Sequence, residues 1–352
     1  MKPARVGLIR GMLCASGVLA LAIGGAWSDK AEAQSASAGE PTPLKLTVRP
    51  RVTRADIQGG VLQASIQPPK NGVGQRLGAG KETARLTKGA AHSSSGKGSG
   101  FAFNPGDLTY QGGQVLPNVV SHNIYVNCTA SCFGNPAVFL NNWGNSGLMH
   151  ATDEFVGTHA SHRYTVGQGG TITGYPVTGP LGPDDLITLI YTAGAVFGSG
   201  YGEIHHIFFG PGIDICQDPG LTICYSPDNF DTFYFCAFHG SVDFPDIGHV
   251  LFSIEPYANV PGCQVNQPSP NSAELDSQAN LLSHELSEAI TDPDGDAWWN
   301  AYSLALYGQE NADECAQAYF DYATTVLNGH AYEVQPVYSN KAHTCVFKPL
   351  DD

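Results

Sequence analysis

The chain has 352 residues, 42% of them hydrophobic, and a formal net charge of −15. The charge is divided unevenly: residues 1–100 hold 14 of the 17 lysines and arginines, whereas residues 101–352 hold 27 of the 32 acidic residues. So acidic a domain excludes nucleic acid as an expected partner, because contacts with phosphate need cations. The acidic surface favours solubility, and bound calcium would neutralise part of it.

Residues 1–33 have the organisation of a secretory signal peptide. Three basic residues precede a stretch at 13–27 that is mostly apolar or small, and Ala-Glu-Ala at 31–33 provides a cleavage site. The apolar run is too short for a membrane span, and no later stretch reaches the ~20 apolar residues that a span needs. The sequence therefore predicts a secreted protein, periplasmic or extracellular, without an integral membrane span.

Residues 34–100 are rich in Ser, Ala, Gly, Pro and Lys and show no sustained apolar period. Such a composition cannot bury a core, so we expect a disordered basic leader or linker. Two readings stay open for this leader. It is either a plain tether or a pro-segment whose positive charge lies against the acidic domain.

Residues 101–352 are aromatic and Gly-rich, and their length suits one domain. Apolar runs predict strands at 119–126, 204–209, 233–238 and 249–254, and helical periodicity predicts helices at 184–195 and 272–291. This alternation favours the α/β class, with a single mixed-sheet domain.

Eight cysteines follow the signal peptide, which itself contains Cys14. An even number in an exported chain predicts four disulfides, and the simplest pairing joins near neighbours. Zinc ligation by thiolates is the alternative, but it prefers CxxC pairs, which this sequence lacks. The predicted pairs are Cys128–Cys132, Cys216–Cys224, Cys236–Cys263 and Cys315–Cys345.

An HExxE motif at 284–288 is the strongest functional signal, and it lies inside the second predicted helix. Asn271 or Ser272 can cap this helix, and Pro293 ends it. Apolar residues gather on one side, whereas four polar side chains fall within about 100° on the other. These four are His284, Glu285, Glu288 and Asp292.

This motif resembles the zincin HExxH sequence with its second histidine replaced by Glu288. An imidazole and a carboxylate at i and i+4 can bind one zinc ion, and Glu285 can take a proton from metal-bound water. The alternative explanation is an ordinary amphipathic helix, which always has polar residues opposite its core stripe.

A third ligand is expected downstream, and Glu310 is the candidate. Asp313, one helical turn later, is either a substitute ligand or a group that orients one. The alternative is an acidic surface turn tethered by Cys315. Asp294 is another possible ligand, within an acidic turn at 292–296 that either binds calcium or simply terminates the helix.

Other histidines and two tryptophans are weaker candidates. His205 and His206 are neighbours on a strand and point to opposite faces, whereas His239 follows a strand and could approach the metal. Trp298 and Trp299 either pack at the edge of the core or form a platform for a sugar.

Six ordered motifs follow one another along residues 101–352. They are YQGG at 110–113, CAFHG at 236–240, HELSE at 284–288, WW at 298–299, ENADEC at 310–315 and VQPVYSN at 334–340. Together they resemble the phosphate-induced protein, or EXORDIUM-like, family of secreted proteins. The chain departs from the plant pattern at Ser287 and in the acidic turn at 292–296, and its basic leader has no counterpart.

The resemblance implies an extracellular, cell-wall-associated protein with a zincin-like fold. With the motif, it predicts a zinc-dependent hydrolase of a protein, peptide or cell-wall substrate, most plausibly a peptidase. His284, Glu288 and Glu310 would bind zinc, and Glu285 would be the general base. The alternatives are a non-catalytic surface-binding protein with structural calcium or zinc, and a carbohydrate-active module.

Overall fold

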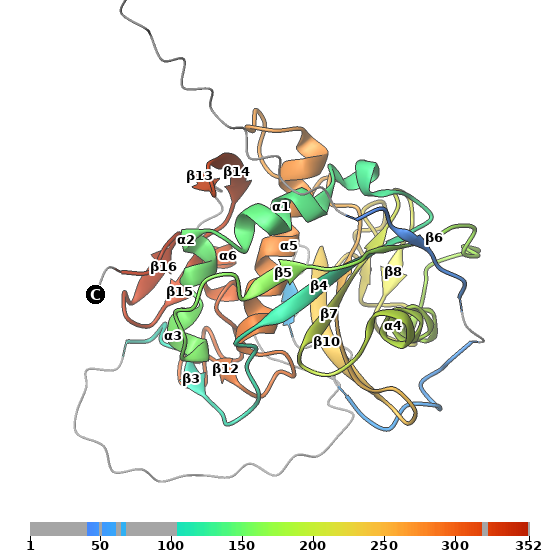
Figure 1. Cartoon of the computed structure of the whole chain (residues 1–352), viewed down its shortest axis with the longest axis horizontal. Helices are drawn as coiled ribbons and strands as arrows, with labels where there is room; N and C mark the ends of the chain where they lie inside the picture. The colour runs from blue at the N-terminus through green and yellow to red at the C-terminus, as the bar shows by residue number, and fades with distance from the viewer. Residues whose placement is uncertain (1–40, 49–50, 61–64, 68–103, 319–322, 351–352) are drawn as a thin grey trace, which may run out of the picture. The chain divides into compact units, whose positions relative to one another are not determined.

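A computed structural model describes residues 41–48, 51–60, 65–67, 104–318 and 323–350 (Figure 1). The predicted signal peptide at 1–33 and most of the predicted leader lie outside these residues.

An eight-stranded mixed sheet forms the centre of the described fold. Neighbouring strands are parallel except β10, which runs antiparallel to β11, and β2, which runs antiparallel to β10. A further strand, β5 (Tyr164–Val166), pairs in parallel with β4. The main path is β1 (Leu44–Lys45), β6 (Gly170–Ile172), β4 (Val119–Val126), β7 (Glu203–Phe209), β11 (Gly248–Glu255), β10 (Ala237–Phe244) and β2 (Ser65–Gln67).

Helices cover both faces of the sheet (Figure 1). Helix α4 (Pro183–Phe197) packs against one face, and helices α5 (Ala273–Thr291) and α1 (Pro136–Trp143) pack against the other. Side chains along β7 point alternately to the two faces of the sheet. Ile207 packs in the core under α4, whereas Phe208 packs in the core under α5. The predicted α/β class with one mixed sheet is therefore confirmed.

Smaller elements surround the α5 side and the ends of the sheet. They are the 3-10 turn η2 (Ala130–Phe133), helices α2 (Gly147–His150), α3 (Asp153–Val156) and α6 (Asp313–Ala318), and the strand pairs β3 (Thr109–Tyr110) with β12 (Trp298–Trp299), β8 (Ile215–Cys216) with β9 (Cys224–Tyr225), β13 (Ala323–Leu327) with β14 (His330–Val334), and β15 (Val337–Ser339) with β16 (Thr344–Val346).

Five of the six predicted elements agree with the structure to within a few residues, but the strand predicted at 233–238 is wrong. The observed strand β10 begins at Ala237 and continues to Phe244. Phe233 instead forms a bridge with Cys224, so the apolar residues before β10 belong to the neighbouring hairpin. Polar and apolar residues alternate in the second half of β10, so this half contains no apolar run that would predict a strand.

Two parts of the predicted leader join the sheet. Strand β1 pairs with β6 at one edge, and strand β2 pairs with β10 at the other. Residues 41–48, 51–60 and 65–67 therefore belong to the fold, and the prediction of a leader without structure is wrong for them. An edge strand needs only backbone hydrogen bonds, so a composition without a core period does not exclude one.

All four predicted cysteine pairs lie at disulfide distance, with Cα separations of 6.4, 4.0, 5.5 and 5.8 Å in chain order. The described residues contain no helix both long and apolar enough to cross a bilayer.

We expect disulfide Cys236–Cys263 to stabilise the fold more than Cys128–Cys132. The cysteines of the first pair are 27 residues apart in the sequence, and those of the second only 4. The first disulfide stabilises more because closing a longer loop lowers the entropy of the unfolded chain more. Replacing the first pair by serines should cost about 3.5 kcal/mol and the second roughly 2 kcal/mol, by urea unfolding. Equal losses would contradict the loop-length argument.

Candidate metal centre

Helix α5 carries the HExxE motif. The side chain of Ser272 caps it by accepting a hydrogen bond from the Leu275 amide at 3.3 Å, and the helix ends at Thr291, two residues before Pro293. Both boundaries follow the prediction. Every residue of α5 from Asp276 to Thr291 is buried.

The polar side of α5 is buried as completely as its apolar side. His284, Glu285 and Glu288 are each 0% exposed. The polar face of this helix therefore does not meet solvent. Something inside the protein must compensate these polar groups, because desolvating a charge without a partner costs several kcal/mol.

The sheet face under α5 is also polar at its centre. Ser253 of β11 donates a hydrogen bond to Glu255 at 2.9 Å, and Gln278 of α5 donates to the other Glu255 oxygen at 3.3 Å. His206 of β7 lies between Ser253 and Ser121, at 2.7 and 3.0 Å. A buried polar layer therefore connects the sheet with the helix that carries the motif.

Two overlapping groups of side chains meet at Glu288. In one group, His284 Nε2 lies 3.1 Å from Glu288 Oε1 and 3.6 Å from Asp313 Oδ1. The Asp313 amide donates to the same Glu288 oxygen at 2.9 Å. Asp313 thus lies beside the first predicted ligand.

His239 of β10 organises the second group. Its Nδ1 lies 3.2 Å from Glu285 Oε2 and 3.7 Å from Glu288 Oε2. Its Nε2 lies 3.5 Å from Glu310 Oε2. Ligand atoms of His239, Glu285 and Glu288 all lie within 4.8 Å of one another, as do those of His284, Glu288 and Asp313.

The structure therefore brings the predicted site residues into one region, in a different arrangement from the one expected. Glu288 contacts both histidines, Asp313 lies beside His284, and Glu310 lies beside His239. His239, a weaker candidate from the sequence, is a central member. Below, the metal centre means these six residues: His239, His284, Glu285, Glu288, Glu310 and Asp313.

Burial and mutual repulsion shift the pKa values in the metal centre. Burial, followed by the charge of Glu288, raises the pKa of Glu285 well above its ordinary value. Burial acts to raise the pKa of Glu288, but the charges of His284 and His239 and the hydrogen bonds to Glu288 together lower it. The charge of Glu288 in turn raises the pKa of His284 against the opposing effect of burial. Such opposed shifts are typical of functional sites.

The donor set fits a divalent cation. Two buried carboxylate oxygens, Glu285 Oε1 and Glu288 Oε2, have no hydrogen-bond partner among the described residues. His284 Nε2 approaches Glu288 Oε1 to 3.1 Å as an ion-pair contact. Arg163, the only lysine or arginine between 104 and 318, pairs with Asp153. Two imidazoles with carboxylates form a typical zinc ligand set.

The acidic turn at 292–296 terminates the helix. Asp292 accepts a hydrogen bond from the Ala297 amide at 2.6 Å, and Gly295 has a positive φ of 73°. Asp294, the alternative third ligand, instead lies 3.1 Å from His249 Nε2 and accepts from Tyr201 at 2.7 Å. The structure thus places it in a separate cluster.

The remaining candidates have structural partners. His205 and His206 point to opposite faces, as predicted: His205 stacks on His122 of β4, whereas His206 bonds Ser253 on the α5 side. Trp298 donates to the Phe155 carbonyl at 3.0 Å and packs on Tyr110, so it lies at the edge of the core.

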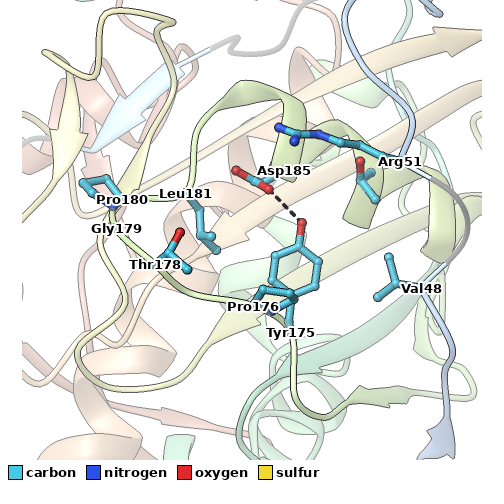
Figure 2. Close-up of a pocket in the computed structure, with 10 residues that line it drawn as sticks. Val48, Arg51, Tyr175, Pro176, Thr178, Gly179, Pro180, Leu181 and Asp185 are labelled. Atoms are coloured by element: carbon cyan, nitrogen blue, oxygen red, sulfur yellow. Dashed lines mark hydrogen bonds between the residues drawn. The ribbon is translucent and has the colours of Figure 1, made fainter.

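A cavity of about 430 Å³ lies elsewhere, between the first turns of α4, the loop before it, and the leader (Figure 2). Val48, Arg51, Tyr175 and Asp185 line it, and Tyr175 donates a hydrogen bond to Asp185 at 3.0 Å. No member of the metal centre lines this cavity.

Sequence reasoning missed Glu255 altogether. This residue is completely buried, and burial raises its pKa to about 8, in a polar layer that also acts on Glu285. The sequence of β11 does contain a pattern that indicates a polar face. Ser253 and Glu255 occupy alternate positions, and therefore one face, after the apolar residues at 250–252.

Comparisons of the chain with models of protein families, with curated proteins and with solved structures found no match in any of the three. The resemblance to the EXORDIUM-like family stays a prediction carried by the six motifs.

We expect His249 to link stability to pH. Its interactions with Asp294 and Asp243 outweigh burial and raise its pKa from 6.5 to about 9. The protonated His249 side chain therefore stabilises the folded state. This stabilisation is fully present below the unfolded pKa of 6.5 and is lost as the pH rises through the folded pKa of about 9. The free energy of unfolding lost in His249→Gln should therefore be larger at pH 6 than at pH 9.5, by urea unfolding. A loss independent of pH would contradict this assignment.

Proposed function

We propose that this chain is a secreted zinc-dependent hydrolase that acts on peptide bonds, and that it is a zincin-like member of the EXORDIUM-like family. One observation carries the proposal: two histidines and four carboxylates converge in one buried site. Four clustered acids with two imidazoles suit a cation better than an apolar core does.

The metal ligands come from three elements. His284 and Glu288 are on α5, and His239 is on β10. Asp313 is the first residue of α6, and Glu310 lies three residues before it. Zinc, when bound, supplies a Lewis acid that polarises a carbonyl and lowers the pKa of water to ~7. Holding donors on a helix and a strand gives the site the rigidity that a catalytic metal needs.

Glu285 is the proposed general base. It lies next to the ligand His284 in the helix, and burial and the charge of Glu288 raise its pKa, the direction in which general bases are tuned. His239 Nδ1, 3.2 Å from Glu285 Oε2, orients that carboxylate, and Asp313 holds Glu288 through its backbone amide at 2.9 Å. Each of these residues thus has a binding, orienting or proton-transfer task.

A second candidate is a non-catalytic surface-binding protein with a structural metal. The burial of the centre, in which only Asp313 is measurably exposed, favours it, because a structural site needs no access for a substrate. The two imidazoles favour zinc over calcium, which prefers six to eight oxygen ligands. A carbohydrate-active module has less support, because Trp298 is packed against Tyr110 and Phe155.

The metal content of the purified protein tests the first step. We expect one zinc per chain by elemental analysis, and at least a tenfold lower content in His284→Ala and Glu288→Ala. The exposed His330→Gln should keep its zinc, as the matched control. A fully folded wild-type protein that binds no transition metal would end the proposal.

Glu285→Gln separates the two candidate functions. If Glu285 is the base, this variant should keep its zinc and lose at least 100-fold in peptide hydrolysis, measured with labelled casein. Glu274→Gln, on the same helix but outside the centre, should stay active. Unchanged hydrolysis in Glu285→Gln would refute the assigned base, and no hydrolysis by any zinc-loaded variant would favour the structural metal.

A further inference from the structure

The VQPVYSN motif at 334–340 has no task yet in the proposed hydrolase. It begins at the last residue of β14, continues through Gln335 and contains β15. Gln335 is only 1% exposed. Because buried polar side chains form hydrogen bonds, the partners of Gln335 indicate what this segment does.

A polar stripe on α5 faces the segments that follow the helix. Side chains four residues apart lie above one another on a helix, so they form one row. Asp276 Oδ1 accepts a hydrogen bond from the Glu333 amide at 3.3 Å, and Asn280 Oδ1 accepts one from the Gln335 amide at 2.8 Å. Two members of the metal centre continue the row beyond these two residues. The stripe consists of Asp276, Asn280, His284 and Glu288.

The side chain of Gln335 reaches the metal centre. Its Nε2 donates to the Ala312 carbonyl at 2.9 Å, next to Asp313. It also forms a hydrogen bond with His284, which adds to the effect of the Glu288 charge in raising the pKa of that histidine against burial. A hydrogen bond has this effect when the partner accepts a ring N–H, so the contact is made by the carboxamide oxygen.

This contact has a direct consequence for metal binding. An imidazole that donates one ring N–H keeps its other nitrogen unprotonated, which is the form that binds a metal. Gln335 is held at its own backbone amide by Asn280 and at its Nε2 by the Ala312 carbonyl. Its oxygen is therefore fixed beside His284 by bonds that do not depend on a metal.

The same motif also anchors the segment that carries the downstream acids. The Tyr338 amide donates to the Asn311 carbonyl at 2.8 Å, and Asn311 Nδ2 donates to the Ser287 carbonyl of α5 at 3.3 Å. The segment from Glu310 to Asp313 is thus held between the motif and the helix.

We propose that Gln335 is a positioning residue of the metal centre: it accepts a ring N–H of His284 and, through the Ala312 carbonyl, holds Asp313 beside that histidine. The inference rests on the zinc binding of the proposed function, and it gives the 334–340 motif a task. Loss of such a partner of a metal-binding histidine typically weakens metal binding 10- to 100-fold.

The test uses the full chain and the variant Gln335→Met, which keeps the length of the side chain but removes both of its hydrogen bonds. Zinc affinity, measured by competition with a chromogenic chelator, should fall at least tenfold. Gln168→Met is the matched control, because Gln168 Nε2 also donates to a backbone carbonyl, that of Thr42 at 2.8 Å, but lies outside the centre. Its zinc affinity should equal that of the wild type.

Cobalt(II) separates positioning from a general loss of stability. Its visible absorption reports the geometry of the ligands, and at saturating cobalt every folded chain is loaded. The spectrum should change in Gln335→Met and stay unchanged in Gln168→Met. A spectrum and a zinc affinity that both match the wild type in folded Gln335→Met would overturn the inference and leave the zinc site intact.

Asn280→Ala provides a second variant, which decides the question if Gln335→Met folds poorly. It removes the acceptor of the Gln335 amide, so zinc affinity should fall here too. The losses in the double variant should be smaller than the sum of the single losses, because both changes act through one group. Fully additive losses, or no loss in Asn280→Ala, would contradict the assigned role.

The outcomes also distinguish this inference from the hydrolase. Weaker zinc binding in Gln335→Met, together with a zinc-loaded wild type that does not hydrolyse casein, would support the positioning role and reject the peptidase. A folded wild-type chain that binds neither zinc nor cobalt would overturn both.

Discussion

Burial of four carboxylates beside two imidazoles is the constraint on which the rest of the structure depends. In the interior, a carboxylate without a partner is costly, and mutual repulsion of neighbouring acids adds to the cost. The contacts of His239 and His284 divide the acids into two groups that share Glu288. A cation held between these groups would compensate the remaining charge, which explains why so polar a layer persists inside the fold.

The two faces of the sheet differ in polarity. On the α4 side, alternate residues of the central strands other than His122 and His205 are apolar and pack in a continuous core. On the α5 side, the same strands present Ser121, His206, Ser253 and Glu255, whose hydrogen bonds extend to Gln278. The apolar side holds the strands in register, so the polar side can carry groups that cost stability. This division is what positions His239 against α5.

Segments of the leader pair with both edges of the sheet. An unpaired edge would offer backbone groups to any extended chain. Pairing at Gly59 and at Ser65–Gln67 satisfies these groups from within the same molecule. This pairing explains why a segment of non-globular composition forms strands.

The sequence by itself determined the elements whose signals are local. Periodicity located the central strands and α5, Ser272 and Pro293 set the ends of that helix, and the order of the cysteines predicted all four pairs. The spacing of His284, Glu285 and Glu288 predicted a shared helix face, because side chains three and four residues apart are neighbours there.

Only the tertiary structure decided what meets that face. It brought His239 from β10 and Glu255 from β11 to α5, placed Glu310 and Asp313 beside different histidines, and assigned Asp294 to His249. It also decided that the polar face is buried and that the leader supplies edge strands. These outcomes depend on strand order and register between distant segments, and no local pattern of residues encodes which segments become neighbours.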